Sequence, residues 1–181
     1  MIIGITGTNG AGKGVLVEYL ATKKGFTHFS ARTFIRDEVE RRGLPLSRDT
    51  LRDVANELRK QHGPAYIVES LFKDASKERN AVIESIRAVG EALFLLGEGA
   101  HIIAIDADRK ERYDRITARD SETDRVTFER FCEQEDREMS STDTWDMNIH
   151  GVMELAAARI MNKGSLEELY AQIDQALTKL S

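Results

Sequence analysis

Thiols and surplus positive charge are both scarce in this sequence. Cys132 is the single cysteine among 181 residues, which excludes a disulfide framework and a thiolate metal cluster and indicates a reducing cytosol. We expect Cys132 to pack as a small apolar side chain. The net charge of -5 argues against a dedicated nucleic-acid binder, because such a surface must neutralise phosphates. We therefore expect a cytoplasmic protein with no nucleic-acid partner, in which any basic site is local.

Long apolar runs, internal repeats and low-complexity linkers are also absent. No stretch approaches the roughly 20 residues that cross a bilayer, so we expect no membrane partner. The chain begins with a short apolar run that passes directly into glycines, a pattern that does not favour a signal peptide. Hydrophobic residues make up 41% and charged residues 31%, which predicts one domain, residues 1–181, with a full core.

Short apolar runs alternate along the chain with segments of helical periodicity. The expected strands are residues 2–6, 27–30, 80–87, 101–107 and 157–161. This alternation predicts an α/β fold in three layers, a doubly wound five-stranded parallel sheet with helices on both faces. Three helical patterns separate the second and third strands, and Pro64 suits the first turn of the last of them. Ligands of such sheets lie at the carboxyl ends of the strands, so the residues that follow each strand are the first candidates for a site.

The segment GTNGAGKGV, residues 7–15, lies between the first strand and a helix and is named here the phosphate loop. Gly7, Gly10 and Gly12 let backbone N–H groups turn toward an anion, and Lys13 adds a positive charge at a helix start. The motif G-x-x-x-x-G-K normally continues with Ser or Thr, whose hydroxyl contacts magnesium. Here Gly14 and then Val15 follow. The loop therefore predicts phosphate binding without the usual hydroxyl.

The Gly-Lys-Gly ending resembles the loop of nucleoside monophosphate kinases, especially adenylate kinases, which read G-x-x-G-x-G-K-G-T and have a hydroxyl where Val15 stands. The resemblance implies a P-loop kinase that uses ATP with Mg²⁺, the metal being held largely by water, nucleotide oxygens and a distant carboxylate. Glu84, at the end of the third strand, is our candidate for that carboxylate and would act through water. With Arg87 it resembles the Asp-Gly-x-x-Arg segment of these kinases, with Glu for Asp and a shorter spacing.

The helix after the fourth strand carries Arg112, Arg115 and Arg119 on one face. It leads into a polar segment that resembles the short lid of this kinase group, at about residues 119–127. Phosphoryl transfer depends on positive charge around the transferred group, which favours Arg115 and Arg119. The predicted catalytic residues are Lys13, Arg87, Arg115 and Arg119.

The segment HFSARTFIRDEV resembles the acceptor-side helix of adenylate kinases, a Ser-Thr-Gly-Asp-x-x-Arg pattern. Ser30 and Arg36 match it, so Arg36 would hold the acceptor's phosphate, and Arg32, expected on a loop at a strand end, is an additional candidate. The helical acceptor-binding insert would span about residues 32–78. Within it Arg52, Asn56 and Arg59 form a polar face that lies against either the acceptor or solvent. The predicted acceptor-binding residues are Ser30, Arg32, Arg36 and Arg87.

Near the end, AARIMNKGSLEELYAQI resembles the last strand and loop of dephospho-CoA kinases and related small kinases. That resemblance implies that the loop 162–164 lies beside the base of the nucleotide. Ser165 and Glu168 also stand in the register of a helix capping box, which explains part of the pattern without a ligand. The residues predicted to bind ATP are Gly7, Asn9, Gly10, Ala11, Gly12, Lys13, Gly14, Val15, Arg115, Asn162 and Gly164.

The acceptor is either an alcohol or a phosphate. An alcohol acceptor commonly needs a carboxylate near the second strand to remove its proton, whereas a nucleotide's phosphate is already ionised and needs arginines. FSARTFIR has two arginines, and its first following carboxylate is Asp37, a turn into the helix. We therefore favour transfer to a (deoxy)nucleoside monophosphate, with small-molecule nucleotides as partners. Dephospho-CoA kinase and a nucleotide-binding regulator with slow ATP hydrolysis remain alternatives, and both monomer and homodimer stay open.

Overall fold

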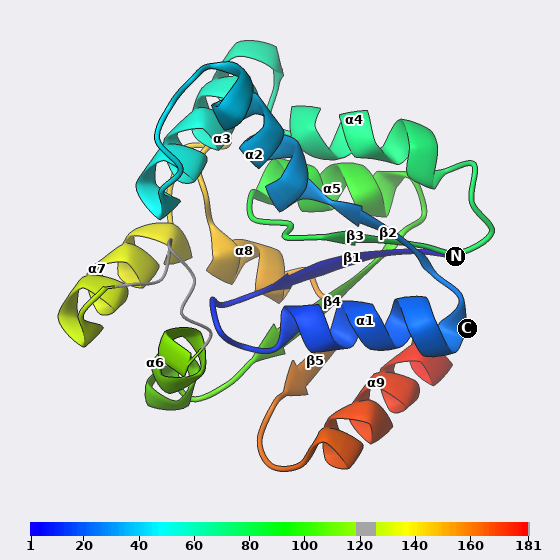
Figure 1. Cartoon of the computed structure of the whole chain (residues 1–181). Coiled ribbons are helices and arrows are strands. Elements are labelled where there is room, and N and C mark those ends of the chain that lie inside the picture. The colour runs from blue at the N-terminus through cyan, green and yellow to red at the C-terminus, as the bar shows by residue number, and fades with distance from the viewer. Residues whose placement is uncertain (119–125, 181) are drawn as a thin grey trace.

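The computed structural model describes residues 1–118 and 126–180 of the chain. Its strands are β1 (Ile2–Gly7), β2 (Thr27–Ser30), β3 (Ala81–Glu84), β4 (His101–Asp106) and β5 (Ala158–Met161). All pairings are parallel, and the strands lie in the order β2-β3-β1-β4-β5 (Figure 1). The predicted doubly wound five-stranded parallel sheet is therefore confirmed.

The register brings the carboxyl ends of four strands to one edge of the sheet. Ser30 at the end of β2 lies opposite Glu84 at the end of β3, and Gly7 at the end of β1 lies opposite Ile105 on β4. Asp106 ends β4 directly after Ile105. Because β1 is the central strand, the loop that follows it is flanked by the ends of both neighbours.

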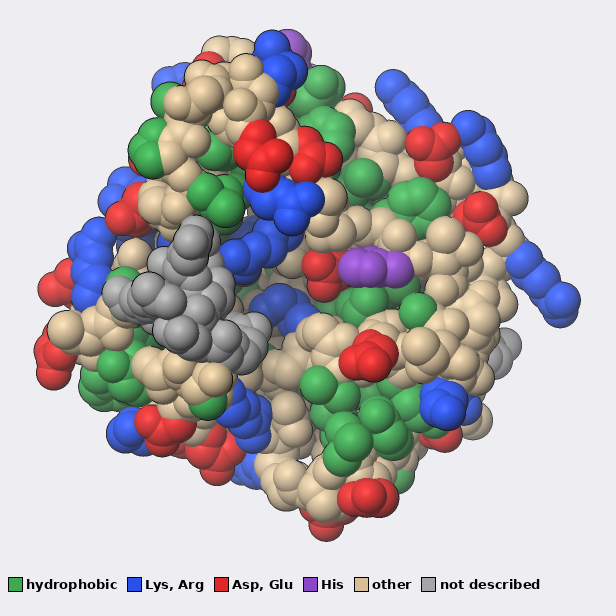
Figure 2. All heavy atoms as spheres, in the orientation of Figure 1, with side chains coloured by type: hydrophobic (Ala, Val, Ile, Leu, Met, Phe, Trp, Pro, Cys, Tyr) green, Lys and Arg blue, Asp and Glu red, His purple; other side chains and the backbone are tan. Residues whose placement is uncertain are grey.

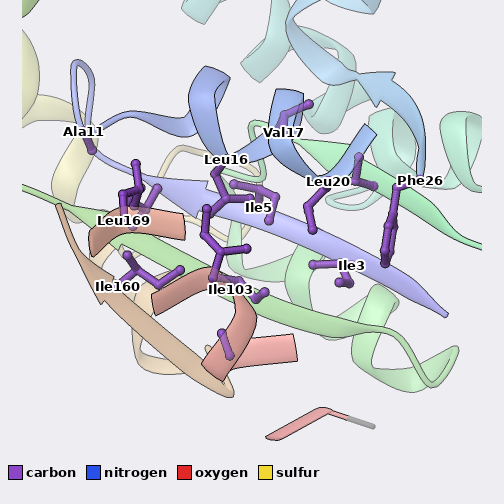
Figure 3. Close-up of a cluster of buried hydrophobic side chains, with 14 residues drawn as sticks. Ile3, Ile5, Ala11, Leu16, Val17, Leu20, Phe26, Ile103, Ile160 and Leu169 are labelled. Carbon is purple, nitrogen blue, oxygen red and sulfur yellow. The ribbon is translucent and has the colours of Figure 1, made fainter. Parts of the chain in front are cut away.

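One face of the sheet is covered by α1 (Lys13–Lys24) and α9 (Leu166–Leu180). Leu16 and Leu20 of α1 and Leu169 of α9 point toward Ile5 and Ile103 of the sheet (Figure 3). All of these side chains are buried, and burying one Leu or Ile contributes about 1.5–3 kcal/mol. This core fixes the position of α1, whose first turn is the end of the phosphate loop.

The other face is covered by α4 (Tyr66–Ala75), α5 (Val89–Gly97) and the short α8 (Ile149–Glu154) (Figure 1). Val68, Leu95 and Val152, one from each helix, share a cluster with the strand residues Ile83 and Ile102. The helix α8 is the shortest of the three. Its six residues begin at the cap Asn148, whose side chain accepts from the N–H of Gly151. A helix this short has too few apolar positions to show a period.

Two helices, α2 (Ala31–Arg41) and α3 (Arg48–His62), stand beyond the carboxyl edge of the sheet and pack on α4. Ser30 ends β2 and caps α2 by accepting from the N–H of Thr33. Arg32, which the sequence placed on a loop, therefore lies in the first turn of α2. Pro64 precedes α4, which begins at Tyr66, so the prediction that it occupies the first turn was wrong.

The helices α6 (Arg109–Ala118) and α7 (Phe128–Met139) follow β4. Their aromatic side chains meet: the ring centroids of Tyr113 and Phe131 are 5.6 Å apart. The expected lid at about 119–127 falls mostly on 119–125, outside the described residues, and so does Arg119. Within the described ranges no helix combines the length and apolar character needed to cross a membrane.

Candidate active site

The phosphate loop curls over the end of β1 in a conformation that needs glycine. Gly7 has φ 140°, and a Cβ there would lie 1.9 Å from the carbonyl oxygen of Ile105. Gly12 has φ 107°, and its Cβ would lie 2.4 Å from Nδ2 of Asn162. Backbone and neighbouring side chains therefore crowd the loop from outside, so its N–H groups are available on the inner side.

Lys13 begins α1 and its ammonium group folds back over the loop. Nζ donates to the carbonyl oxygens of Gly7, at 2.9 Å, and of Thr8, at 2.7 Å. Burial and the positive charge of Arg87 lower the pKa of Lys13 to about 7, although the Glu84 carboxylate acts in the opposite direction. A phosphate group placed beside this ammonium group would add negative charge and favour its protonated form.

The carboxylate of Asp106 anchors the loop from the neighbouring strand, a role that the sequence reasoning missed. It accepts the hydroxyl of Thr8 and the N–H of Ala107. Arg112 from α6 supports the same region, because its Nη1 donates to the carbonyl oxygen of Asn9 at 3.2 Å. The signal was present in the sequence: Asp106 is a polar residue at the carboxyl end of an apolar strand.

Gly14 and Val15 differ in how they meet their surroundings. A Cβ on Gly14 would meet no atom of the described residues within 4 Å, apart from its own neighbours in the helix, whereas Val15 is half-buried against the core between α1 and α9. Both line the main cleft described below. A side chain at position 14 would therefore enter the cleft without a steric cost, so nothing in the packing explains the glycine there.

The main cleft lies along the phosphate loop and has a volume of about 830 Å³, within the range of small-molecule sites. It is lined by Asn9, Gly10, Gly12, Lys13, Gly14, Val15, Glu18, Arg32, Glu84, Ser85, Arg87, Arg115 and Ala118. Residues from β3, α1, α2 and α6 thus converge on one space, at the sheet edge where ligands of doubly wound folds bind.

Arg115 of α6 lines this cleft, and hydrogen bonds connect it with Asn162, the residue after β5, and with the phosphate loop. Arg115 Nη2 donates to the carbonyl oxygen of Asn162 at 3.2 Å, and Asn162 Nδ2 donates to the carbonyl oxygen of Ala11 at 2.8 Å. Nη1 of Arg115 is buried and has no hydrogen-bond partner among the described residues, an arrangement that a ligand oxygen would satisfy.

Like Asn162, Gly164 lies outside the cleft lining, although the sequence predicted that both bind ATP. Its φ is 96°, and a Cβ there would lie 2.0 Å from Oε2 of Glu168. That oxygen accepts the N–H of Ser165, and the Ser165 hydroxyl accepts the N–H of Glu168. The glycine is thus accounted for by the capping box that begins α9.

Glu84 lies at the end of β3 and faces the cleft. Its Oε1 accepts the Ser30 hydroxyl at 2.9 Å and lies 3.7 Å from Nε2 of His28. Burial alone would raise the pKa of Glu84, but the nearby His28, the hydrogen bond from Ser30 and the charge of Lys13 outweigh it, so the pKa lies below its usual value. The carboxylate is therefore ionised near neutral pH.

Glu84 and the phosphate loop beside it are compatible with the binding of Mg²⁺ together with a nucleotide. The described residues contain no group of three or more His, Cys, Asp or Glu side chains that could hold a metal ion. Mg²⁺ usually keeps several waters and takes one or two carboxylates together with phosphate oxygens. Glu84 would hold one of these waters, and a bound nucleotide would supply phosphate oxygens as further ligands.

A second space, named here the arginine cavity, adjoins the main cleft on the side of α2 and α3 and measures about 50 Å³. Asn9, Arg32, Ser85 and Arg87 line both spaces. The cavity is further lined by Ile35, Arg48, Leu51, Arg52, Glu138 and Met147. Figure 2 shows Lys and Arg side chains gathered in a hollow on this face of the molecule. The arginine cavity is therefore a cationic chamber that opens beside the phosphate loop.

The polar face of α3 divides between two environments. Arg52 is buried at the cavity and pairs with Asp49 and Asp53. Arg59 is completely buried and pairs with Glu91 at 2.8 Å. Arg59 therefore lies against neither the cavity nor solvent, and only the Arg52 end of the predicted face reaches the site.

Glu91 links this buried pair to the site, because its Oε2 accepts the backbone N–H groups of Arg87 and Ala88, each at 3.0 Å. Ser85, in the turn between β3 and Arg87, has φ 68°. The Asp-Gly-x-x-Arg pattern that this segment resembles has glycine at that position. Non-glycine residues in this conformation are strained and concentrate at functional sites.

Arg36, which the sequence predicted to hold the acceptor's phosphate, lies on α2 away from the phosphate loop. It stands one turn beyond Arg32 on α2, its side chain is 47% exposed and it pairs with Asp37 and Glu40. It lines neither the main cleft nor the arginine cavity. Because α2 begins directly at the strand end, Arg32 occupies the position near the phosphate loop. Arg48 and Glu138, which sequence reasoning missed, lie there instead.

The strand order, the phosphate loop after the central strand and the carboxylate at the end of the adjacent strand together define a P-loop protein with the fold of P-loop kinases. Residues 3–145 match a family model described as an AAA domain. The UPF0200 protein of Methanococcus vannielii is 30% identical over 184 residues, which cover 99% of this chain and 96% of that protein. The chain therefore belongs to the UPF0200 family of AAA-domain P-loop proteins.

Solved structures agree with this fold. The Thermus thermophilus protein TT1252 superimposes with a TM-score of 0.64 at 22% sequence identity. The superposition covers 100% of this chain and 98% of the TT1252 chain. Dephospho-CoA kinase from Campylobacter jejuni superimposes with a TM-score of 0.53 at 15% sequence identity, and the superposition covers 99% of this chain and 97% of the kinase chain. The similarity to small P-loop kinases that the sequence predicted is confirmed at the level of the fold.

Proposed function

We propose that this protein is an ATP-dependent kinase that transfers a phosphoryl group to the phosphate of a (deoxy)nucleoside monophosphate and forms the diphosphate. The observation that carries the proposal is the arginine cavity, which opens beside the phosphate loop and shares Arg87 with the main cleft. A cationic chamber at this place suits an acceptor that brings its own negative charge to the reaction.

On the donor side, the phosphate loop and Lys13 would hold the phosphates of ATP. Arg115 would meet a further oxygen with its Nη1, which has no hydrogen-bond partner within residues 1–118 and 126–180. Mg²⁺ bound with the nucleotide, through water to Glu84, would neutralise charge on the phosphate oxygens. Arg87 lines both spaces and would contact the transferred group from the acceptor side. Phosphoryl transfer depends mainly on such positioning and positive charge.

On the acceptor side, the described residues lining the arginine cavity include one carboxylate, that of Glu138. It is already bound by Arg48 and Arg87, so it is poorly placed to take a proton from an alcohol. Asp37 is 61% exposed and pairs with Arg36 outside the cavity. A phosphate acceptor is ionised near pH 7 and needs no base. This favours a monophosphate over the ribose hydroxyl of dephospho-CoA.

The experiment incubates the protein with Mg²⁺ and ATP labelled in the γ-phosphate, together with each common nucleoside and deoxynucleoside monophosphate or with dephospho-CoA. Label in a diphosphate product supports the proposal. Label in coenzyme A alone, or release of inorganic phosphate at a rate that no acceptor changes, contradicts it.

A pair of variants on α2 separates acceptor binding from ATP binding. Arg32→Ala should raise the KM for the acceptor about tenfold or more, the scale of losing one hydrogen bond to a charged group, with little change in the Kd for ATP. Arg36→Ala is the matched control one turn away, and its acceptor KM should stay within about twofold of the wild type. Equal effects of the two variants would contradict the assignment of the cavity.

A nucleotide-binding regulator remains the second candidate because of one observation. Gly14 and Val15 provide no hydroxyl for magnesium, although a side chain at position 14 has open space. A protein that hydrolyses ATP slowly and signals through α2 and α3 would tolerate that loss. Hydrolysis that is independent of every acceptor in the panel is its expected result.

A further inference from the structure

Glu138 is a buried carboxylate held between two arginines at the wall of the arginine cavity. Arg48 binds it with both arms of its guanidinium, Nε to Oε1 at 2.9 Å and Nη2 to Oε2 at 2.8 Å. Arg87 Nη1 donates to the same Oε2 at 2.8 Å. The Glu138 side chain is 2% exposed. The carboxylate thus occupies a built anion position between arginines of two different elements.

The surroundings of Glu138 depend on this anion. Burial alone would raise the pKa of Glu138, but the charge of Arg87, the hydrogen bond from Arg48 and the charges of Arg48 and Arg52 lower it. The residue stands in the last turn of α7, which ends at Met139, where the helix dipole disfavours negative charge. Its place in the fold is therefore stabilised by the arginines and not by its own helix.

Arg87 connects this anion position with the reaction. It lines the main cleft as well as the cavity, and the charges of Arg87, Arg48 and Glu138 all act on Lys13 of the phosphate loop. An acceptor phosphate bound by Arg48 and Arg87 would lie beside the donor phosphates. The Glu138 carboxylate fills this position between Arg48 and Arg87.

We propose that Glu138 is a specificity-determining residue that acts as an internal competitor: its carboxylate occupies the acceptor's phosphate position, and an acceptor binds by displacing it from Arg48 and Arg87. This inference rests on the proposed function and names the chemical class of acceptor, a phosphate dianion.

The exchange of anions explains the selectivity. A ligand with a single carboxylate would exchange its own negative charge for that of Glu138, so it gains no Coulomb energy from the arginines. It still loses translational freedom on binding. A phosphate dianion adds a second negative charge and a third oxygen to the same guanidinium groups. Glu138 therefore sets a threshold that dianions pass and that monoanions of similar size do not.

The chain provides a matched control on the same helix. Glu135 lies three residues before Glu138, is also 2% exposed, and pairs with Arg112 and Arg109 of α6. It lines neither the arginine cavity nor the main cleft. Glu135→Gln removes an equally buried carboxylate from α7 and leaves the proposed anion position intact.

The test uses ribose 5-phosphate and ribonate, a sugar phosphate and a sugar carboxylate without a base, and calorimetry at pH 8. The wild type and Glu135→Gln should bind ribose 5-phosphate and show no measurable binding of ribonate. Glu138→Gln should bind ribose 5-phosphate about tenfold more tightly and should bind ribonate, because the neutral amide no longer competes for the arginines. Its Kd for ATP should change less than its Kd for ribose 5-phosphate, because Glu138 binds Arg48 and Arg87 directly and acts on Lys13 only through its charge.

A purely structural role of Glu138 predicts the opposite sign. If the carboxylate merely holds Arg48 and Arg87 in position, Glu138→Gln weakens ribose 5-phosphate binding, and that result overturns the proposal. Absence of ribose 5-phosphate binding in both proteins also overturns it. Tighter binding in Glu138→Gln with no phosphoryl transfer to any nucleoside monophosphate sustains the anion exchange and refutes the proposed function alone.

A measurement on the wild type keeps the proposal testable if Glu138→Gln does not fold. Saturating ribose 5-phosphate should speed hydrogen exchange of the backbone amides in the last turns of α7, because the displaced side chain no longer ties this helix to α3. Inorganic sulfate, also a dianion, should do the same. Unchanged or slower exchange in α7 with both anions overturns the proposal.

Discussion

Asn162, the residue after β5, donates a hydrogen bond of 2.8 Å from Nδ2 to the carbonyl oxygen of Ala11 in the phosphate loop. The same Nδ2 would lie only 2.4 Å from a Cβ built on Gly12. The two contacts show that the loop is shaped from outside by a side chain 151 positions away from Ala11. The curvature of the phosphate loop thus depends on the far strand of the sheet.

Asn162→Ala should therefore weaken ATP binding about fivefold, because loss of one such hydrogen bond costs about 1 kcal/mol. Isothermal calorimetry with ATP measures it. Gln172→Ala is the control, since Gln172 also donates an amide hydrogen bond to a backbone oxygen, that of Met161, away from the loop. A similar loss of affinity in both variants would refute the role of Asn162.

ATP binding should take up a proton at Lys13. The pKa of Lys13 is about 7 in the ligand-free protein, so at pH 8 most of these side chains are neutral, and phosphates bound beside Nζ raise the pKa. The ammonium form binds phosphate better, hence ATP affinity should fall as the pH rises above 7, by at most about tenfold per pH unit. Below pH 7 Lys13 is already protonated and this dependence disappears.

Calorimetry at pH 8 in two buffers of different ionisation enthalpy counts the protons. Lys13→Arg keeps a positive charge that does not titrate in this range, so its binding should take up none through this residue. Equal proton uptake in the wild type and in Lys13→Arg would show that another group is responsible.

Restoring a hydroxyl after Lys13 should raise metal-dependent activity. A Cβ on Gly14 meets no atom of the described part of the chain within 4 Å beyond its own helix, so Gly14→Thr places a hydroxyl at the motif position and its Cβ has open space. We expect an increase of several-fold, roughly tenfold at most, in Mg²⁺-dependent turnover. Val15→Thr should act in the same direction but less, because Val15 packs partly against the core.

Gly14→Ala separates the hydroxyl from the added carbon, and its turnover should match the wild type. Steady-state kinetics over a range of Mg²⁺ concentrations makes the comparison. An equal gain from Ala and Thr would assign the effect to helix propensity, which favours both residues over glycine. No response to either hydroxyl would favour the regulator.

The buried pair of Arg59 and Glu91 should be a main determinant of stability. Both side chains are 0% exposed, and Glu91→Gln would leave the Arg59 guanidinium buried without a counter-charge, at a cost of about 3–5 kcal/mol. Urea denaturation measures it. Asp74→Asn breaks the exposed pair of Asp74 and Lys77 and should change the free energy of unfolding by less than about 1 kcal/mol. Comparable losses in the two variants would contradict this ranking.

The fold was predictable because its signals are local. Short apolar runs separated by helical periods predict parallel strands with crossovers, and the order β2-β3-β1-β4-β5 then places the strand ends at one edge. The errors fell where tertiary packing overrides local pattern. Ser30 ends a strand and caps a helix at once, so Arg32 lies in the first turn of α2 and not in the expected loop.

The sequence by itself determined the phosphate loop, because its glycines, Lys13 and the flanking strand and helix are contiguous in the chain. It also placed Glu84 and Arg87 at a strand end. Only the tertiary structure decided what surrounds them: Arg48 and Glu138 lie 90 positions apart and meet because α3 and α7 pack beside the same cavity. No local spacing encodes such a meeting, since an ion pair between distant elements is set by how their apolar faces are buried.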